Sequence, residues 1–171
     1  SADLSVSSYS GTIKDAAGNT AGAASGDLGA VIVDANSPAF SSVAAADATY
    51  KVGQNIDITV TWDQAVAVTG TTGLTLSNGA AATYVSGTGN AALVFRYAVV
   101  EGNTNSSDRK VTGYTGTIAD AAGNTAAAIT NPSDLGAVIV DANSPTVTGV
   151  TSTSSNGFYI NGNTLSIQVI L

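Results

Sequence analysis

The side chains that could do chemistry in this sequence are its carboxylates. The chain has 171 residues, with twelve Asp and Glu against five Lys and Arg, and it has no His and no Cys. A thiolate or imidazole metal ligand is therefore ruled out, as is an imidazole general base. What remains is the chemistry of hard oxygen ligands, since Ca²⁺ takes about six to eight oxygens from carboxylates, Asn side chains and backbone carbonyls. We therefore expect a cation-binding protein and not an enzyme.

Eight of the twelve carboxylates fall at four positions that occur twice in the sequence. Residues 9–38 and 114–145 are nearly the same sequence, with a two-residue insertion in the second copy, and both end in DLGAVIVDANSP. A repeat of 105–107 residues matches one small β-sandwich per period. The paired acids are Asp3 and Asp108, Asp15 and Asp120, Asp27 and Asp134, and Asp34 and Asp141.

The repeat divides the chain into three segments. We expect residues 1–33 to be the C-terminal part of one repeat, residues 34–140 a complete repeat, and residues 141–171 the N-terminal part of the next. The last assignment depends on the match of the sequence around Tyr159 to that around Tyr50. The chain is then the end, the whole and the beginning of one unit.

The complete repeat shows strand signals at short, regular intervals. Apolar and polar residues alternate over 56–62, 74–76 and 93–99, and this period of two is typical of a strand with one buried face. Asn78-Gly79 between two such runs indicates a hairpin. About seven strands in about a hundred residues predict an all-β fold of tandem immunoglobulin-like sandwiches. The aromatic residues could form a sugar-binding platform, but their alternation with polar neighbours favours core packing: Trp62, Tyr84, Phe95, Tyr97 and Tyr114.

These strands would gather the acids at the two ends of the unit. In a seven-stranded sandwich of the usual order, two loops lie where the chain enters and another lies where it leaves. We therefore expect Asp63, Asp120 and Asn124 beside Asp34 and Asn36 at the first end. At the second end, Glu101 and Asp108 should lie beside Asp141 and Asn143. Both sets supply the oxygens that Ca²⁺ prefers, so the sequence predicts calcium at the linkers between units.

The Asp120-Ala-Ala-Gly-Asn124 segment also has a simpler interpretation. Asp and Asn near Gly are ordinary turn residues that bond their own backbone, so this segment by itself favours a plain hairpin turn over a metal loop. Asp34-Ala-Asn-Ser-Pro38 is the better candidate. It places a carboxylate and an amide two residues apart, before a Pro that stops the preceding strand.

The order of these motifs resembles a known family. Tyr50-x-x-Gly-x-x-Ile-x-Ile-x-Val, Leu74-x-Leu-x-x-Gly, Leu93-x-Phe-x-Tyr-x-Val and Asp120-Ala-Ala-Gly-Asn together look like the tandem Ig-like repeats of large bacterial surface adhesins and extracellular filament proteins. The linker is similar to the calcium linker of cadherins, although Ser37 and Ser144 stand where a second Asp-Asn pair would be. The resemblance implies repeats that hold a binding tip away from the cell, with one or two ions per linker.

The leading hypothesis is therefore an extender segment of a bacterial surface adhesin or extracellular fibre, with neighbouring repeats as its partners. One alternative is a filament built by strand exchange between chains, and another is a glycan- or protein-binding module that uses loop 100–108. The net charge of −7 argues against nucleic acid. No apolar run approaches the roughly 20 residues of a membrane helix, so insertion into a membrane is not expected.

Overall fold

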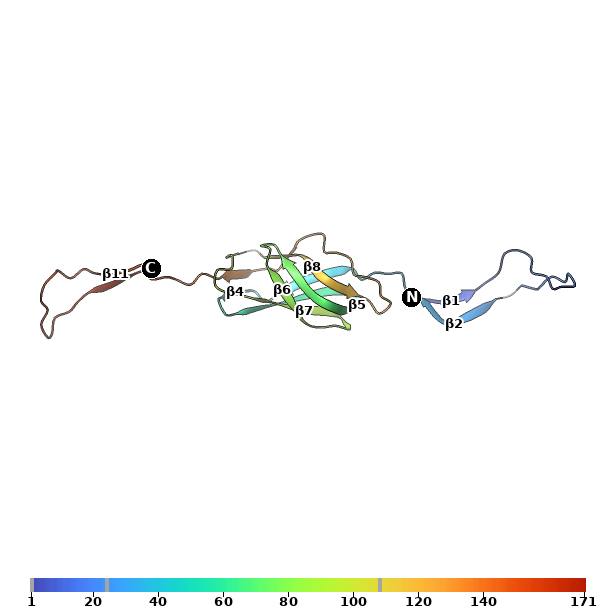
Figure 1. The fold of residues 1–171 in the computed structure, drawn as a ribbon, viewed down its shortest axis with the longest axis horizontal. Helices are drawn as coiled ribbons and strands as arrows, with labels where there is room; N and C mark the ends of the chain where they lie inside the picture. The colour runs from blue at the N-terminus through green and yellow to red at the C-terminus, as the bar shows by residue number, and fades with distance from the viewer. Residues whose placement is uncertain (1, 24, 108) are drawn as a thin grey trace.

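The computed structural model describes residues 2–23, 25–107 and 109–171, and all of its regular structure in these ranges is β-strand. A central body lies between two hairpins that project from its opposite ends (Figure 1). We call these parts the tail hairpin (residues 2–33), the central unit (39–140) and the head hairpin (146–171), and residues 34–38 and 141–145 join them. The strands are β1 (Ala2–Val6), β2 (Gly26–Val33), β3 (Phe40–Ala45), β4 (Ala48–Lys51), β5 (Asn55–Leu76), β6 (Ala81–Ser86), β7 (Asn90–Ala98), β8 (Lys110–Ala119), β9 (Ser133–Asp134), β10 (Val138–Asp141), β11 (Gly149–Ser152) and β12 (Ile167–Ile170).

The central unit is organised around the 22-residue strand β5. The first half of β5 pairs antiparallel with β3 and β7, while its second half pairs antiparallel with β6 and β8. A separate parallel pair joins β10 to β4, so the end of the unit is fastened beside its beginning. These pairings give an all-β, sandwich-like unit in which β5 connects the two groups of strands.

The predicted strands over 56–62 and 74–76 are parts of this one strand, which is a correction to the sequence interpretation. Asp63, which we expected in a loop, lies within β5. The connecting segment stays extended because Ala67, Val68 and Thr69 pair with β8. The ladder is interrupted between Thr69 and Gly73, where Gly70 adopts a positive φ of 72°. This irregularity bends the strand without ending it, a role that glycine fills at little steric cost.

Strand alternation builds the core as predicted. Every second residue of β5 from Ile56 to Trp62 is buried, and the pattern resumes over the Leu74–Leu76 end of the strand. Trp62, Phe95 and Tyr97 are at most 4% exposed, and Tyr84 and Tyr114 pack half-buried against the same cluster. The aromatic residues are therefore core residues. The core cluster takes its members from residues 40–142 only, so the central unit closes without either hairpin.

The two hairpins repeat the local structure of the central unit without its core. Val150 pairs with Val169 in the head as Val43 pairs with Val60 in the central unit. In the tail, Ser5 pairs with Asp27 in the register that joins Lys110 to Asp134. Their apolar residues, however, lie on the surface: Ile13 is 55% exposed and its counterpart Ile118 0%, while Ile167 is 64% exposed and its counterpart Ile58 0%.

Candidate functional site: the two linkers

The sequence Asp-Ala-Asn-Ser-Pro occurs once at each end of the central unit. We call residues 34–38 the N-terminal linker and residues 141–145 the C-terminal linker. In both, the backbone N–H of the Asn donates to the carboxylate of the Asp two residues before it, at 3.2 Å for Asn36 and 3.3 Å for Asn143. The two linkers therefore share one local turn, which an Asp side chain forms readily with its own backbone.

The N-terminal linker is held through its carbonyl groups. Asn124 Nδ2 donates to the Asp34 carbonyl at 3.0 Å, and Gln64 Nε2 donates to the Asn36 carbonyl at 3.1 Å. The Pro38 carbonyl accepts from the N–H of Ala127 at 2.9 Å. All three donors belong to the central unit, which follows this linker in the chain.

Asp63 fastens the residue after the N-terminal linker. Its carboxylate accepts from the N–H of Ala39 at 2.8 Å, and its own N–H donates to the Ala39 carbonyl at 3.0 Å. This pair of bonds fixes the direction in which the chain enters β3.

The Asp120–Asn124 segment positions Asn124 for this contact. Asp120 Oδ1 accepts from the N–H groups of Ala122 and Asn124, both at 2.9 Å, and Asp120 Oδ2 accepts from Asn124 Nδ2 at 2.9 Å. The amide of Asn124 and these backbone donors lower the pKa of Asp120. The Asp120–Asn124 segment therefore forms a turn, as predicted. The Asp120 carboxylate holds the Asn124 side chain in the position from which it donates to the linker.

The C-terminal linker is held through different groups. Asn105 donates from Nδ2 to the Asp141 carboxylate at 3.0 Å and accepts at Oδ1 from the Ala142 N–H at 2.7 Å. Glu101 accepts from the Ser144 N–H at 3.0 Å and from the Ser144 hydroxyl at 2.6 Å, and these bonds lower the pKa of Glu101. The N–H of Gly102 donates to the Ala142 carbonyl at 3.1 Å. The loop after β7 therefore binds the C-terminal linker where the chain leaves the central unit.

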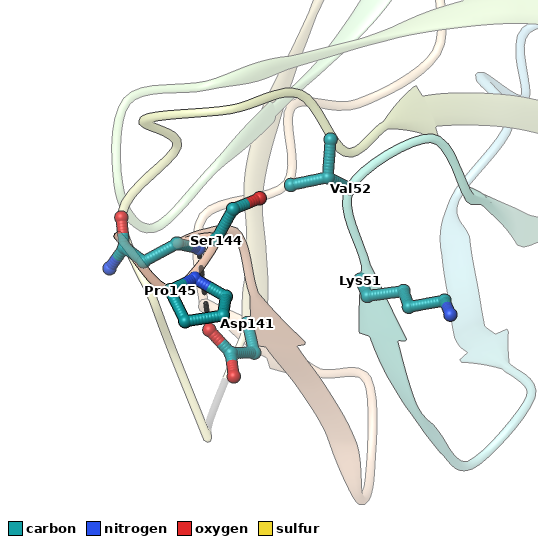
Figure 2. Close-up of a pocket in the computed structure, with 6 residues that line it drawn as sticks. Lys51, Val52, Asp141, Ser144 and Pro145 are labelled. Carbon is teal, nitrogen blue, oxygen red and sulfur yellow. Dashed lines mark hydrogen bonds between the residues drawn. The ribbon is translucent and has the colours of Figure 1, made fainter. Parts of the chain in front are cut away.

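A cleft of about 470 Å³ opens beside the C-terminal linker. Figure 2 shows the linker on one side of this cleft and the turn after β4 on the other, with the Lys51 side chain directed away from Asp141. The polar groups that line the cleft come mainly from the C-terminal linker. The lining residues are Lys51, Val52, Asp141, Asn143, Ser144 and Pro145.

The described residues predicted to bind calcium lie at or beside the two linkers, and the carboxylates of Asp63, Asp120 and Glu101 accept hydrogen bonds from protein donors there. Asn124 contacts the N-terminal linker directly, Asp63 contacts the residue after it, and Asp120 contacts Asn124. Glu101 contacts the C-terminal linker. Asp108 lies outside the described residues. Among the residues that the structure describes, no three acidic, His or Cys side chains form a group that could hold a metal ion. Both oxygens of Asp120 and of Glu101 already accept hydrogen bonds from protein groups, so an ion would have to share or replace these bonds.

Two residues that hold the linkers had no signal in the sequence. Gln64 and Asn105 make direct contacts but belong to no repeated motif within the chain. Copies of Gln64 and Asn105 would fall outside residues 1–171, so the internal repeat could not single them out.

Comparison with protein-family models, with curated proteins and with solved structures found no match. Within the described ranges there is also no helix of the length and apolarity that crossing a bilayer requires.

Proposed function

We propose that this chain is an extender segment of a bacterial cell-surface adhesin or extracellular fibre, built from Ig-like units joined end to end. The observation that carries the proposal is the placement of the linkers. The N-terminal and C-terminal linkers leave the central unit at opposite ends, and the flanking hairpins continue away from it on either side (Figure 1). A unit that receives the chain at one end and releases it at the other lengthens an array with each repeat.

The fastening of both linkers supports the same function. Each linker is held to the central unit by side-chain and backbone hydrogen bonds. A Gly- or Ser-rich linker would behave as a flexible coil and would let neighbouring units fold back on one another. Held linkers instead give each unit a defined direction relative to the next, which an extender needs.

Small-angle X-ray scattering on proteins with one, two and four copies of residues 34–140 tests this proposal. The maximum dimension should grow in proportion to the number of units. If the maximum dimension does not increase from two to four units although all units are folded, the proposed extender function is wrong.

Calcium at the linkers stays a prediction of the sequence. Asp34, Asn36, Asp141 and Asn143 still offer oxygens there, but a full shell would require Glu101 or Asp120 to exchange hydrogen bonds for the ion. Isothermal titration with CaCl₂ after chelation decides the question. Heat of binding that disappears in the Asp141→Asn variant would place the ion at the linker, and no heat at millimolar calcium would exclude it.

The exposed hairpins favour a second candidate, a filament assembled between chains. In the central unit, Ile139 pairs with Thr49 in the β10–β4 ladder. The equivalent residues Ile32 in the tail and Phe158 in the head are 63% and 106% exposed. The tail and head hairpins that carry them lie at opposite ends of one molecule (Figure 1), so these two segments could pair only between two chains.

Cysteines at positions 32 and 158 test this assembly, because the chain has no other Cys. Oxidation should join chains into a ladder of disulfide-linked species if tail and head pair in this register. A Cys at position 32 combined with one at Val85, on the central unit, is the matched control. Equal cross-linking of both pairs would mean random collision and would end the strand-exchange idea.

A further inference from the structure

We infer that the Asp-Ala-Asn-Ser-Pro linker is a two-sided docking strip. One set of its groups binds the preceding unit and another set binds the following unit. The junction is then rigid without a metal ion. The inference rests on the proposed end-to-end array. The same five residues occur once before and once after the central unit, so the contacts of the N-terminal linker can be compared directly with those of the C-terminal linker.

The backbone and polar groups divide between the two units. Toward the preceding unit, the C-terminal linker uses the Asp141 carboxylate, the N–H and carbonyl of Ala142, and the N–H and hydroxyl of Ser144. Toward the following unit, the N-terminal linker uses the carbonyls of residues 34, 36 and 38. Among these side-chain and loop hydrogen bonds no atom belongs to both sets. Asp141 also pairs with Lys51 in the β10–β4 ladder of the preceding unit, but a backbone carbonyl has two lone pairs and can accept a bond from each side. Both sets of bonds can therefore form at once on one linker.

The apolar side chains divide in the same way. In the N-terminal linker Pro38 is buried and Ala35 is exposed, whereas in the C-terminal linker Ala142 is buried and Pro145 is exposed. The Ala thus packs into the unit that precedes the linker, and the Pro packs into the unit that follows it. A linker between two complete units would bury both residues, which adds apolar burial to the hydrogen bonds at the junction.

The free side of the C-terminal linker shows where the next unit would sit. Pro145 and Asn143 line the cleft of about 470 Å³ shown in Figure 2. In the N-terminal linker, the equivalent positions 38 and 36 contact Ala127 and Gln64 of the unit that follows. We therefore assign the cleft to the N-terminal end of another copy of this repeat, whose Gln and Asn amides reach the linker carbonyls.

This division makes an ion unnecessary. Backbone groups at an interface between units need hydrogen-bond partners once water is excluded, and here protein groups supply them from both sides. The carboxylates of Glu101 and Asp120 serve as acceptors that fix Ser144 and Asn124, and these in turn fix the linker. The acids that the sequence gathers at the linkers therefore act as hydrogen-bond acceptors.

A tandem protein with residues 34–140 followed by residues 34–145 tests the inference. It contains one complete linker between two units whose cores close within each unit. A nitroxide label on Cys at Val85 of each unit, an exposed position, reports the distance between units by pulsed electron paramagnetic resonance. We expect a narrow distance distribution in EDTA that CaCl₂ leaves unchanged.

The controls use the same substitutions in the other unit. Glu101→Ala in the first unit and Asn124→Ala in the second unit touch the complete linker, and each should abolish the narrow distribution. Glu101→Ala in the second unit and Asn124→Ala in the first unit do not touch that linker and should leave the distribution narrow. If Asn124→Ala unfolds the second unit, as circular dichroism would show, Gln64→Ala in that unit replaces it.

Two results would overturn the inference. One is a broad distribution in EDTA, whether or not calcium narrows it. The other is a narrow distribution that none of the linker-facing substitutions broadens. The extender function fails separately, because it depends on the mean distance: a narrow distribution centred on a short distance would leave the docking strip intact and exclude an extended array.

Discussion

Replacing Asn124 with Ala should destabilise the central unit through the linker. The Asn124 amide donates to the Asp34 carbonyl at 3.0 Å and to Asp120 Oδ2 at 2.9 Å, in a partly buried position. A net hydrogen bond of this kind contributes about 1 kcal/mol, so we expect the free energy of unfolding to fall by about 1–2 kcal/mol. For a unit of this size that corresponds to a drop in Tm of roughly 4–8 °C per kcal/mol. Thermal unfolding of the 171-residue chain at pH 7, followed by circular dichroism, measures the change.

Part of this difference should depend on pH. Asn124 lowers the pKa of Asp120 in the folded chain, so its bond to the carboxylate stabilises the fold above the unfolded Asp pKa of about 3.9. That contribution disappears as the pH falls through the lower, folded pKa. The gap in Tm between the wild type and Asn124→Ala should therefore narrow below about pH 4. It should not close, because the bond to the Asp34 carbonyl does not titrate.

The chain supplies a matched control in Asn19. Its amide donates to Asp15 Oδ2 at 2.9 Å in the same turn, but among the described residues it contacts no linker carbonyl. Asn19→Ala should leave the Tm of the central unit unchanged. An unchanged Tm in Asn124→Ala, or an equal drop in both variants, would refute the assignment of stability to the linker contact.

Three further predictions concern the central unit. Arg109 is fully buried; its Nη2 donates to the Thr104 carbonyl at 2.7 Å and its guanidinium lies over the Tyr97 ring, but among the described residues its Nε and Nη1 have no hydrogen-bond partner. Replacing a buried, partly satisfied charge with an apolar side chain is often neutral or stabilising, so Arg109→Leu, which introduces the residue found at the equivalent Leu4, should leave the urea midpoint equal or higher. Phe95→Ala removes a side chain that is 0% exposed and should cost about 3–5 kcal/mol in the same urea titration. Asp57→Asn breaks the ion pair with Arg96, whose side chains are 49% and 43% exposed, and should cost less than about 1 kcal/mol at pH 7. Because the bond from Arg96 lowers the pKa of Asp57, that small cost should shrink in melts below about pH 4 and disappear only as the pH falls through the lowered, folded pKa.

Much of the fold could be predicted because alternation and turn chemistry are local. The period-two run from Ile56 to Trp62 became the buried face of β5, and Asn78-Gly79 became the turn between β5 and β6. The alternation could not show that β5 continues through Asp63, because that depends on pairing with β8, about fifty residues further along the chain.

The sequence indicated where the acidic side chains gather but not which donors their oxygens contact. The repeat indicated that the acids gather at the linkers, and Glu101 and Asp120 do lie there. Whether a carboxylate oxygen binds an ion or an N–H depends on donors close to it in space. Those donors are Ser144 for Glu101 and Asn124 for Asp120, and for Glu101 the donor is 43 positions away in the sequence. Composition and spacing describe the acceptors well and say little about such donors.

The two linkers show most directly why sequence identity does not fix environment. Ala35 and Ala142 occupy the same position in identical five-residue sequences, yet only Ala142 is buried, and for Pro38 and Pro145 the order is reversed. The local turn is the same in both, so the difference comes from which side of the linker carries the packed central unit. In the proposed array, the groups that each linker leaves unused would form the surface that the next unit has to match. Specificity between such repeats would then depend on the ends of the units. A unit that lacked Gln64 and Asn124 would still fold around its own core but would dock poorly on the linker that precedes it.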